Sequence, residues 1–223
     1  MSEEVNMGYP PAPWTLKGYA VQTLQLMDTK RALQFVPSGL PIVSILPGKT
    51  LGVVYLASYG PGSTLEYNEL IIVPALTRYA RKLGFWISHI YVDNPDSMIG
   101  GRELWGLPKE MAQFTWDRGE ESQITVRQNG RLLCTMQYGR PRWLLPVPIY
   151  LPTFSRRDSN LLWFKGNITA RMGIARGRWQ VPDESPFAPL DLSRSGLTYH
   201  YQDMNFVASA PRVLAQSRAT ARA

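Results

Sequence analysis

The chain has 223 residues, of which 44% are hydrophobic and 18% charged. This length and balance predict a folded protein with a buried core and exclude an intrinsically disordered chain. No run of about 18 apolar residues occurs, so neither a membrane-spanning helix nor a membrane partner is expected. The acidic N-terminus lacks the apolar segment of a signal peptide. The lone cysteine, Cys134, fits a reducing compartment, so we expect a cytoplasmic protein.

The net charge of +7 is unevenly distributed: the charges of residues 1–110 cancel, and residues 111–223 carry the whole excess. A basic half can indicate nucleic-acid binding. Its arginines are scattered, however, with no dense run and no nucleic-acid motif, so we do not expect a nucleic-acid partner. An ordinary basic surface is the main interpretation, and a local field that attracts small anionic substrates is the other.

The first half of the chain mixes strand-like and helical patterns. Strands are expected where apolar, β-branched and aromatic residues cluster between turn residues, in residues 16–26, 51–60, 66–76 and 84–93. A short helix is expected at 28–36, with Asp28 as its N-cap. A second short helix is expected at 94–106, opened by Asn94 and closed by Gly106.

The second half is almost entirely β in pattern. Alternating residues on both sides of Asn129-Gly130, a dipeptide preferred in type I′ turns, predict a hairpin over 122–139. Residues 141–152 contain too many prolines for a central strand and indicate a lid or an edge segment. Residues 161–182 predict a further hairpin or pair of strands that bend at internal glycines.

No repeat, linker or change of composition divides the chain. We therefore predict one domain over residues 1–223, with flexible ends at 1–14 and 212–223. The expected fold class is mainly β, or β-rich α+β: a largely antiparallel, closed β-barrel with a few short helices.

Few residues offer catalytic chemistry. The two histidines, His89 and His200, belong to no cluster with the spacing of metal ligands, so no metal site is expected. His89 lies in a strand-like segment and is interpreted as a packed residue. The G-x-S-x-G motif of a hydrolase nucleophile is absent from the sequence. Lysine and carboxylate chemistry remain.

Lys109 lies between a Leu-Pro turn and a segment, 109–116, that alternates like a strand. In an extended segment Lys109 and Met111 share one face, and Glu110 takes the other. A lysine that is held in a partly apolar cavity and has lost its proton can attack a ketone and form an imine, or Schiff base. From this spacing alone, a strand-end lysine that points to water is the stronger interpretation.

Two segments favour the nucleophilic lysine over a lysine that points to water. Tyr-Asn-Glu at 67–69 is followed by GFWISHIYVDNPDSMIGGRELWGLPKE at 84–110. Together they resemble the acetoacetate decarboxylase family, which has a Tyr-x-Glu, a strand ending in Asp-Asn, a Gly-Arg-Glu, and a Pro-Lys that carries the Schiff-base lysine. The four elements occur here in the same order. A weaker similarity extends back to Lys17 and forward through the β-rich half.

The resemblance implies roles for individual residues. Lys109 matches the imine-forming lysine, and Glu69 matches the glutamate near the reacting carbonyl. The positions expected to bind substrate are Lys17 (where the family has an arginine that meets the substrate carboxylate), Tyr67, Arg102 and Glu110. The implied reaction is decarboxylation of a β-keto acid, in which the protonated imine accepts the electrons released as CO2 leaves. No metal and no organic cofactor is required, and the family resemblance implies a homo-oligomer.

The sequence departs from the family at three places. Glu110 stands where authentic decarboxylases have a second lysine, and residues 53–58 lack a carboxylate that the family has. Lys17 replaces the arginine and loses its bidentate recognition of a carboxylate. We therefore predict a cofactor-independent carbon–carbon lyase that forms an imine with a β-keto acid or related carbonyl compound, for decarboxylation or for aldol or dehydration chemistry. The alternative is a non-catalytic β-barrel that binds a hydrophobic small molecule.

Overall fold

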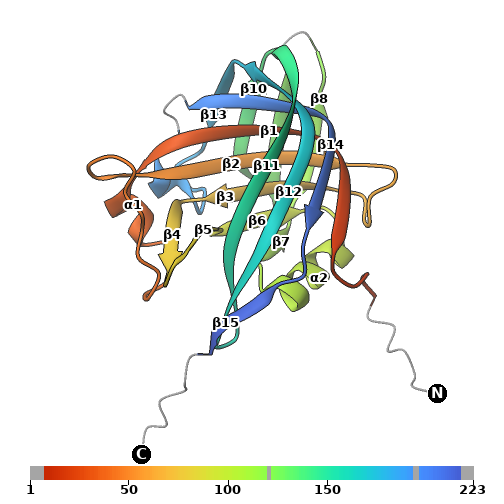
Figure 1. The fold of residues 1–223 in the computed structure, drawn as a ribbon. Helices are drawn as coiled ribbons and strands as arrows, with labels where there is room; N and C mark the ends of the chain where they lie inside the picture. The colour runs from red at the N-terminus through yellow and green to blue at the C-terminus, as the bar shows by residue number, and fades with distance from the viewer. Residues whose placement is uncertain (1–7, 120–121, 193–195, 217–223) are drawn as a thin grey trace, which may run out of the picture.

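The computed structural model describes residues 8–119, 122–192 and 196–216. They form two β-sheets, with the short helices α1 (Thr29–Leu33) and α2 (Pro95–Trp105) at opposite ends of the larger one (Figure 1). The strands of the large sheet are β1 (Trp14–Asp28), β2 (Lys49–Tyr59), β3 (Tyr67–Val73), β4 (Ala75–Tyr79), β5 (Lys82–Trp86), β6 (His89–Val92), β7 (Lys109–Met111), β11 (Arg142–Arg157), β12 (Asn160–Ala175), β14 (Leu197–Ala208) and β15 (Arg212–Gln216). The small sheet contains β8 (Gln113–Asp117), β9 (Ser122–Gln128), β10 (Arg131–Tyr138) and β13 (Gly177–Gln180). A 3-10 helix, η1 (Ala188–Leu190), precedes β14.

The large sheet has the strand order β4-β5-β11-β12-β14-β1-β2-β3-β6-β7, and β15 also pairs with β12. The mainly β, largely antiparallel fold is confirmed, but the closed barrel is wrong, because the sheet is an open half-barrel. After only three residues of β7 the chain crosses at Ala112 into β8 of the small sheet. Within the described residues, the β7 edge is therefore left short and is not paired with β4.

Residues alternate between the two faces of the large sheet. On one face, side chains such as Leu56 and Ile72 pack against Ile124 and Met136 of the small sheet in a common core. On the concave face, Tyr55 belongs to a second apolar cluster. The period of two along each strand therefore decides whether a side chain joins the core between the sheets or faces the inside of the half-barrel.

Local signals placed the helices and the main hairpin correctly. Asp28 caps α1 by accepting a hydrogen bond from the backbone N–H of Lys30 at 2.9 Å. Asn94 caps α2, and Gly106 ends it in the left-handed conformation with φ 61°. The β9–β10 hairpin turns at Asn129, whose φ is 50°, and at the glycine that follows it.

The proline-rich segment is a strand with a largely free edge. β11 pairs with β12 along its length, whereas β5 contacts it only at Thr153 and Phe154. Pro146, Pro148 and Pro152 are separated by even steps, so their missing N–H groups all lie on the same side of the strand. The expectation of an edge segment over 141–152 is therefore met in a longer strand.

Of the two alternatives for residues 161–182, a hairpin or a pair of strands, the second is confirmed. β12 is one long strand of the large sheet, and β13 pairs with β10 of the small one. Within the C-terminal segment 212–223, residues Arg212–Gln216 form β15, which pairs with β12. Of the N-terminal end, Trp14 is buried at the start of β1. Residues 1–7 and 217–223 of the two predicted flexible ends lie outside the described residues.

Three smaller observations concern His89, Cys134 and the membrane. His89 packs edge-on against Phe35 and Phe187, and burial lowers its pKa. Cys134 is fully buried, which raises the pKa of its thiol. Neither α1 nor α2, nor any other helix of the described chain, has the length and apolarity to span a bilayer.

Candidate active site

A small cavity lies on the concave face of the large sheet. Its volume is about 100 Å³. Its walls are mostly aliphatic and aromatic, and its polar lining residues are Gln22, Tyr55, Tyr67, Glu69, Lys109 and Thr153. Since apolar walls with a few convergent polar groups are typical of ligand sites, this cavity is the candidate active site.

Lys109 lies at the start of β7 and is only 2% exposed. Its Nζ atom is 2.9 Å from Oε1 of Glu69, which is 3% exposed. Nζ also donates hydrogen bonds to Ser97 Oγ at 2.9 Å and to Tyr67 OH at 3.4 Å. It lies 4.8 Å from the centroid of the Tyr67 ring and 5.7 Å from that of Trp14. The structure thus places the predicted lysine and glutamate in one buried ion pair, and the interpretation of a lysine pointing to water is wrong.

A second hydrogen bond fixes the other oxygen of Glu69. The hydroxyl of Tyr59 donates to Oε2 at 3.0 Å, and the hydroxyl of Tyr55 lies 3.3 Å from that of Tyr59. Because the one proton of Tyr59 is engaged by the carboxylate, Tyr59 can only accept from Tyr55, whose hydroxyl also donates to Sδ of Met204 at 3.3 Å. Burial raises the pKa of both phenols, so they stay protonated, and Tyr59 acts as a donor to the carboxylate and not as a base.

Helix α2 lets the lysine reach this position. Its buried residues include Ser97 and Gly101, one turn apart on the same face. A Cβ at Gly101 would collide with the side chain of Lys109, so only glycine leaves room for the lysine to pass along the helix. Arg102 is exposed, and its Nε donates to the backbone carbonyl of Lys109 at 2.7 Å. Arg102 therefore holds the backbone of the lysine and does not line the cavity.

Glu110 is outside the cavity. It is exposed, and it accepts a hydrogen bond at 2.7 Å from Nε2 of Gln128, which belongs to the small sheet. Lys109 and Glu110 are neighbours on an extended strand, so they take opposite faces, as the alternation predicts. The replacement of the family's second lysine by this glutamate therefore puts no carboxylate against the Lys109 amine.

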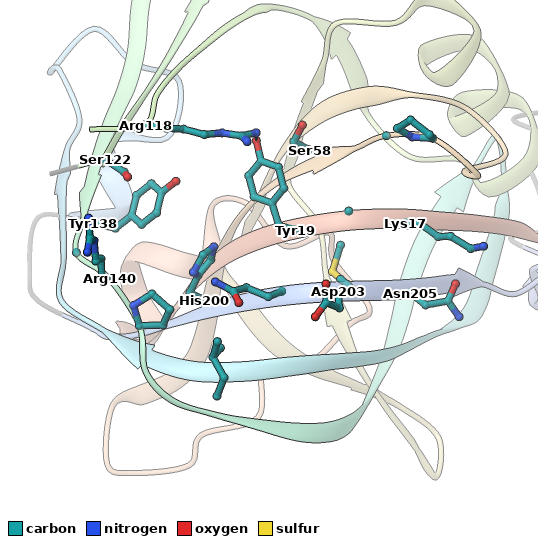
Figure 2. Close-up of a pocket in the computed structure, with 18 of the residues that line it drawn as sticks. Lys17, Tyr19, Ser58, Arg118, Ser122, Tyr138, Arg140, His200, Asp203 and Asn205 are labelled. Atoms are coloured by element: carbon teal, nitrogen blue, oxygen red, sulfur yellow. Dashed lines mark hydrogen bonds between the residues drawn. The ribbon is translucent and has the colours of Figure 1, made fainter. Parts of the chain in front are cut away.

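Lys17 is also outside the cavity. It lines a separate, open groove of about 1160 Å³, together with Arg118 and Arg140. Figure 2 shows Lys17 at one end of this basic groove and Arg140 at the other. On β1 the cavity is lined by Leu16, one residue before Lys17, so alternation turns the lysine to the other face.

Several residues of the site were not singled out from the sequence: Trp14, Gln22, Tyr55, Tyr59 and Ser97. One signal for Ser97 was available. The small residues Ser97, Gly100 and Gly101 recur at helical spacing before Trp105, and such a stripe indicates close contact with another part of the chain. The tyrosines of β2 lacked a comparable signal, because their role depends on how β2 pairs with β3.

The paired amine and carboxylate can exchange a proton within the cavity. In one state Lys109 is an ammonium and Glu69 a carboxylate; in the other, the amine is neutral and the acid is protonated. A neutral lysine amine is a nucleophile toward carbonyl carbon. This geometry thus provides a nucleophile and an acid–base group within 2.9 Å of each other.

Comparison with known proteins gives relatives of several kinds. Protein NEOXANTHIN-DEFICIENT 1 of Solanum lycopersicum is 30% identical over 110 residues, which are 49% of this chain and 37% of that protein. The chain thus spans well under two thirds of the length of that relative. Acetoacetate decarboxylase from Legionella pneumophila superposes with a TM-score of 0.75 at 16% identity, over 95% of this chain and 90% of that one. The enduracididine biosynthesis enzyme MppR in complex with pyruvate superposes with a TM-score of 0.69 at 18% identity, over 96% and 94% of the two chains.

These solved structures have the same fold as this protein. The family model described as acetoacetate decarboxylase matches residues 3–162, well over half of the sequence. With Lys109 and Glu69 inside the matched part, the chain belongs to the acetoacetate decarboxylase family.

Proposed function

We propose that the protein is an enzyme that forms a Schiff base between Lys109 and a small carbonyl compound. The observation that carries the proposal is the buried pair of Lys109 and Glu69, 2.9 Å apart on the wall of a small apolar cavity. A structural ion pair has no need of an adjoining cavity. A nucleophile does, because the reacting carbonyl must approach it.

The reaction follows from the pair. Lys109 passes a proton to Glu69, and the amine nitrogen forms a bond to the carbonyl carbon. A proton moves from nitrogen to the carbonyl oxygen, giving a carbinolamine. Glu69 then returns its proton to the hydroxyl group, the C–O bond breaks, and water leaves. The product is an iminium ion that faces the carboxylate of Glu69, as the ammonium did before.

Membership of the acetoacetate decarboxylase family supports this reaction for a small carbonyl substrate. The solved complex of MppR holds pyruvate, which is a carbonyl compound. Ser97 accepts a hydrogen bond from the lysine, and Tyr59 donates one to the far oxygen of the glutamate, so together they favour one geometry of the pair.

Reductive trapping tests the proposal. The protein is incubated with a panel of small aldehydes and ketones and with cyanoborohydride, and the adduct is located by peptide mass spectrometry. We expect the adduct on Lys109, and its loss in Lys109→Met. Lys165 is an exposed lysine and provides the matched control, since Lys165→Met should leave the adduct unchanged. Binding of the panel without any adduct on Lys109 would favour the non-catalytic binding protein instead.

A further inference from the structure

The charges that line the cavity are balanced. Among its lining residues, all of which belong to the described chain, Lys109 is the only cation and Glu69 the only carboxylate. The other two cations considered for substrate binding lie elsewhere: Lys17 lines the open groove, and Arg102 is exposed and holds the backbone of Lys109. A substrate carboxylate would therefore find no second cation inside.

We infer that the carbonyl compound taken by this cavity is uncharged, an aldehyde or ketone without a carboxylate. This inference rests on the proposed Schiff base at Lys109. It names the substrate class that the cavity selects, and it differs from the keto acid implied by the family resemblance.

The charge balance holds through the reaction only for a neutral substrate. The ammonium of Lys109 facing Glu69 becomes an iminium facing the same carboxylate, so the net charge of the cavity stays at zero. A keto acid would add one negative charge among aliphatic and aromatic walls, where an unpaired ion is strongly disfavoured. It would also compete with Glu69 for the single cation.

One uncharged polar side chain lines the cavity from β1. Gln22 is 5% exposed and is the only amide in the lining. An amide both donates and accepts hydrogen bonds, so it can orient a neutral oxygen function without adding charge. An arginine or lysine at this place would be the expected solution for a carboxylate.

A neutral carbonyl compound has no CO2 to lose, so the iminium must react in another way. Glu69 can take a proton from the carbon next to the iminium. The C–H electrons then form a C=C bond, and the C=N electrons move to nitrogen, which gives an enamine. An enamine exchanges its α-hydrogens with solvent and forms or breaks carbon–carbon bonds.

Isosteric pairs of compounds test the inference on the unmodified protein. Pyruvate is compared with 3-methylbutan-2-one, and acetoacetate with 4-methylpentan-2-one, because each ketone replaces the carboxylate by a branched, uncharged group of similar size. The rate of cyanoborohydride trapping on Lys109 is divided by the rate on Nα-acetyl-lysine, which corrects for the reactivity of each carbonyl. We expect the corrected rate to be at least about tenfold higher for the ketones at pH 7.

The outcomes separate the inference from the proposed function. Equal or faster corrected trapping of the keto acids on Lys109 would overturn the inference and leave the Schiff base standing. Absence of an adduct from both classes would remove the proposed function itself. Exchange of α-deuterium from D2O into the ketones, lost in Lys109→Met, would support both.

Substitutions of Gln22 provide an independent test of the inference. In Gln22→Lys the added cation should raise the corrected rate for the keto acids relative to the ketones, whereas Gln22→Met should not. Thermal denaturation shows first whether each variant folds, and the wild-type comparison decides the inference if Gln22→Lys does not. A folded Gln22→Lys protein with an unchanged preference would count against the charge argument.

Discussion

The cavity and the basic groove are two hollows of opposite character that share strand β1. The cavity holds about 100 Å³ and has apolar walls around one buried ion pair. The groove holds about 1160 Å³, lies open, and carries exposed cations such as Arg118 (Figure 2). On β1, Leu16 faces the cavity and Lys17 the groove, so a step of one residue moves a side chain from one hollow to the other.

The difference shows that size alone does not indicate where the chemistry occurs. In the groove, water and salt screen the charges, and each cation behaves as an ordinary surface group. In the cavity, the same kinds of group are desolvated and held at fixed distances, so their interactions are strong and directional. Matched substitutions, one in the cavity and one at an exposed site, measure this contrast.

The largest effect on stability is expected for substitution of Glu69, with Glu110 as the control. Glu69→Gln leaves the ammonium of Lys109 buried without its counter-ion, and removal of one partner of a buried pair costs about 3 kcal/mol or more of unfolding free energy. For a chain of this size this corresponds to a fall in Tm of about 6 to 12 °C. Glu110→Gln is the control, and it should change the unfolding free energy by no more than about 0.5 kcal/mol, because Glu110 is exposed. Urea denaturation of both variants measures the difference.

A double-mutant cycle sharpens this result. Adding Lys109→Met to Glu69→Gln removes the unpaired charge, so the double variant should be more stable than Glu69→Gln alone. Additive losses in the cycle would mean that the two side chains do not interact energetically, in contradiction to their 2.9 Å contact.

The second-largest effect on stability is expected for substitution of Tyr59, with Tyr19 as the control. Tyr59→Phe removes the hydrogen bond to the buried carboxylate, which costs about 2 kcal/mol, since the acceptor is charged. Tyr19→Phe in the groove removes a hydroxyl that accepts from Arg118 at a solvated site, and it should cost less than about 1 kcal/mol. The trapping rate on Lys109 should fall only in Tyr59→Phe. Equal losses in both variants would show that the cavity does not strengthen the bond.

Much of the fold was predictable because its signals are local. Asp28, Asn94, Gly106 and the Asn129-Gly130 turn each specify backbone conformation within a few residues. The open half-barrel was not predictable in this way. It depends on the crossing at Ala112 from one sheet to the other, which no local pattern encodes.

The residues of the site also divide into those that the sequence predicts and those that depend on how strands pair. Lys109 and Glu69 were found from the order of motif elements, and the alternation of β7 placed Glu110 on the other face. Tyr59 was missed because its contact depends on register: Tyr59 pairs with Tyr67, and Ala57 pairs with Glu69. Tyr59 and Glu69 are therefore diagonal neighbours on one face. That relation follows from the loop joining β2 and β3, which a single sequence does not define.

A smaller effect on stability is expected for substitution of Gly101, with Gly139 as the control. Gly101→Ala would press a Cβ against the middle of the Lys109 side chain, which must shift along the helix to make room. Stability should therefore change by only about 1 kcal/mol, whereas the trapping rate on Lys109 should fall about tenfold as the amine shifts from its position. Gly139 lines the groove and has open space at its Cβ position, so Gly139→Ala should leave the trapping rate unchanged. Peptide mass spectrometry after timed trapping measures both rates.

The smallest effect is expected for the groove lysine. Lys17→Ala removes an exposed cation that does not line the cavity, so trapping of neutral ketones on Lys109 should stay within about twofold of the wild type. In the unmodified protein Lys17 itself should carry little adduct, because it is exposed, whereas Lys109 is buried among apolar walls. The keto acids give the stricter test. If Lys17→Ala lowered their trapping on Lys109 tenfold while leaving that of the ketones intact, the groove would deliver anions to the cavity, and the two hollows would form one site. Equal behaviour of both compound classes in Lys17→Ala would keep them separate.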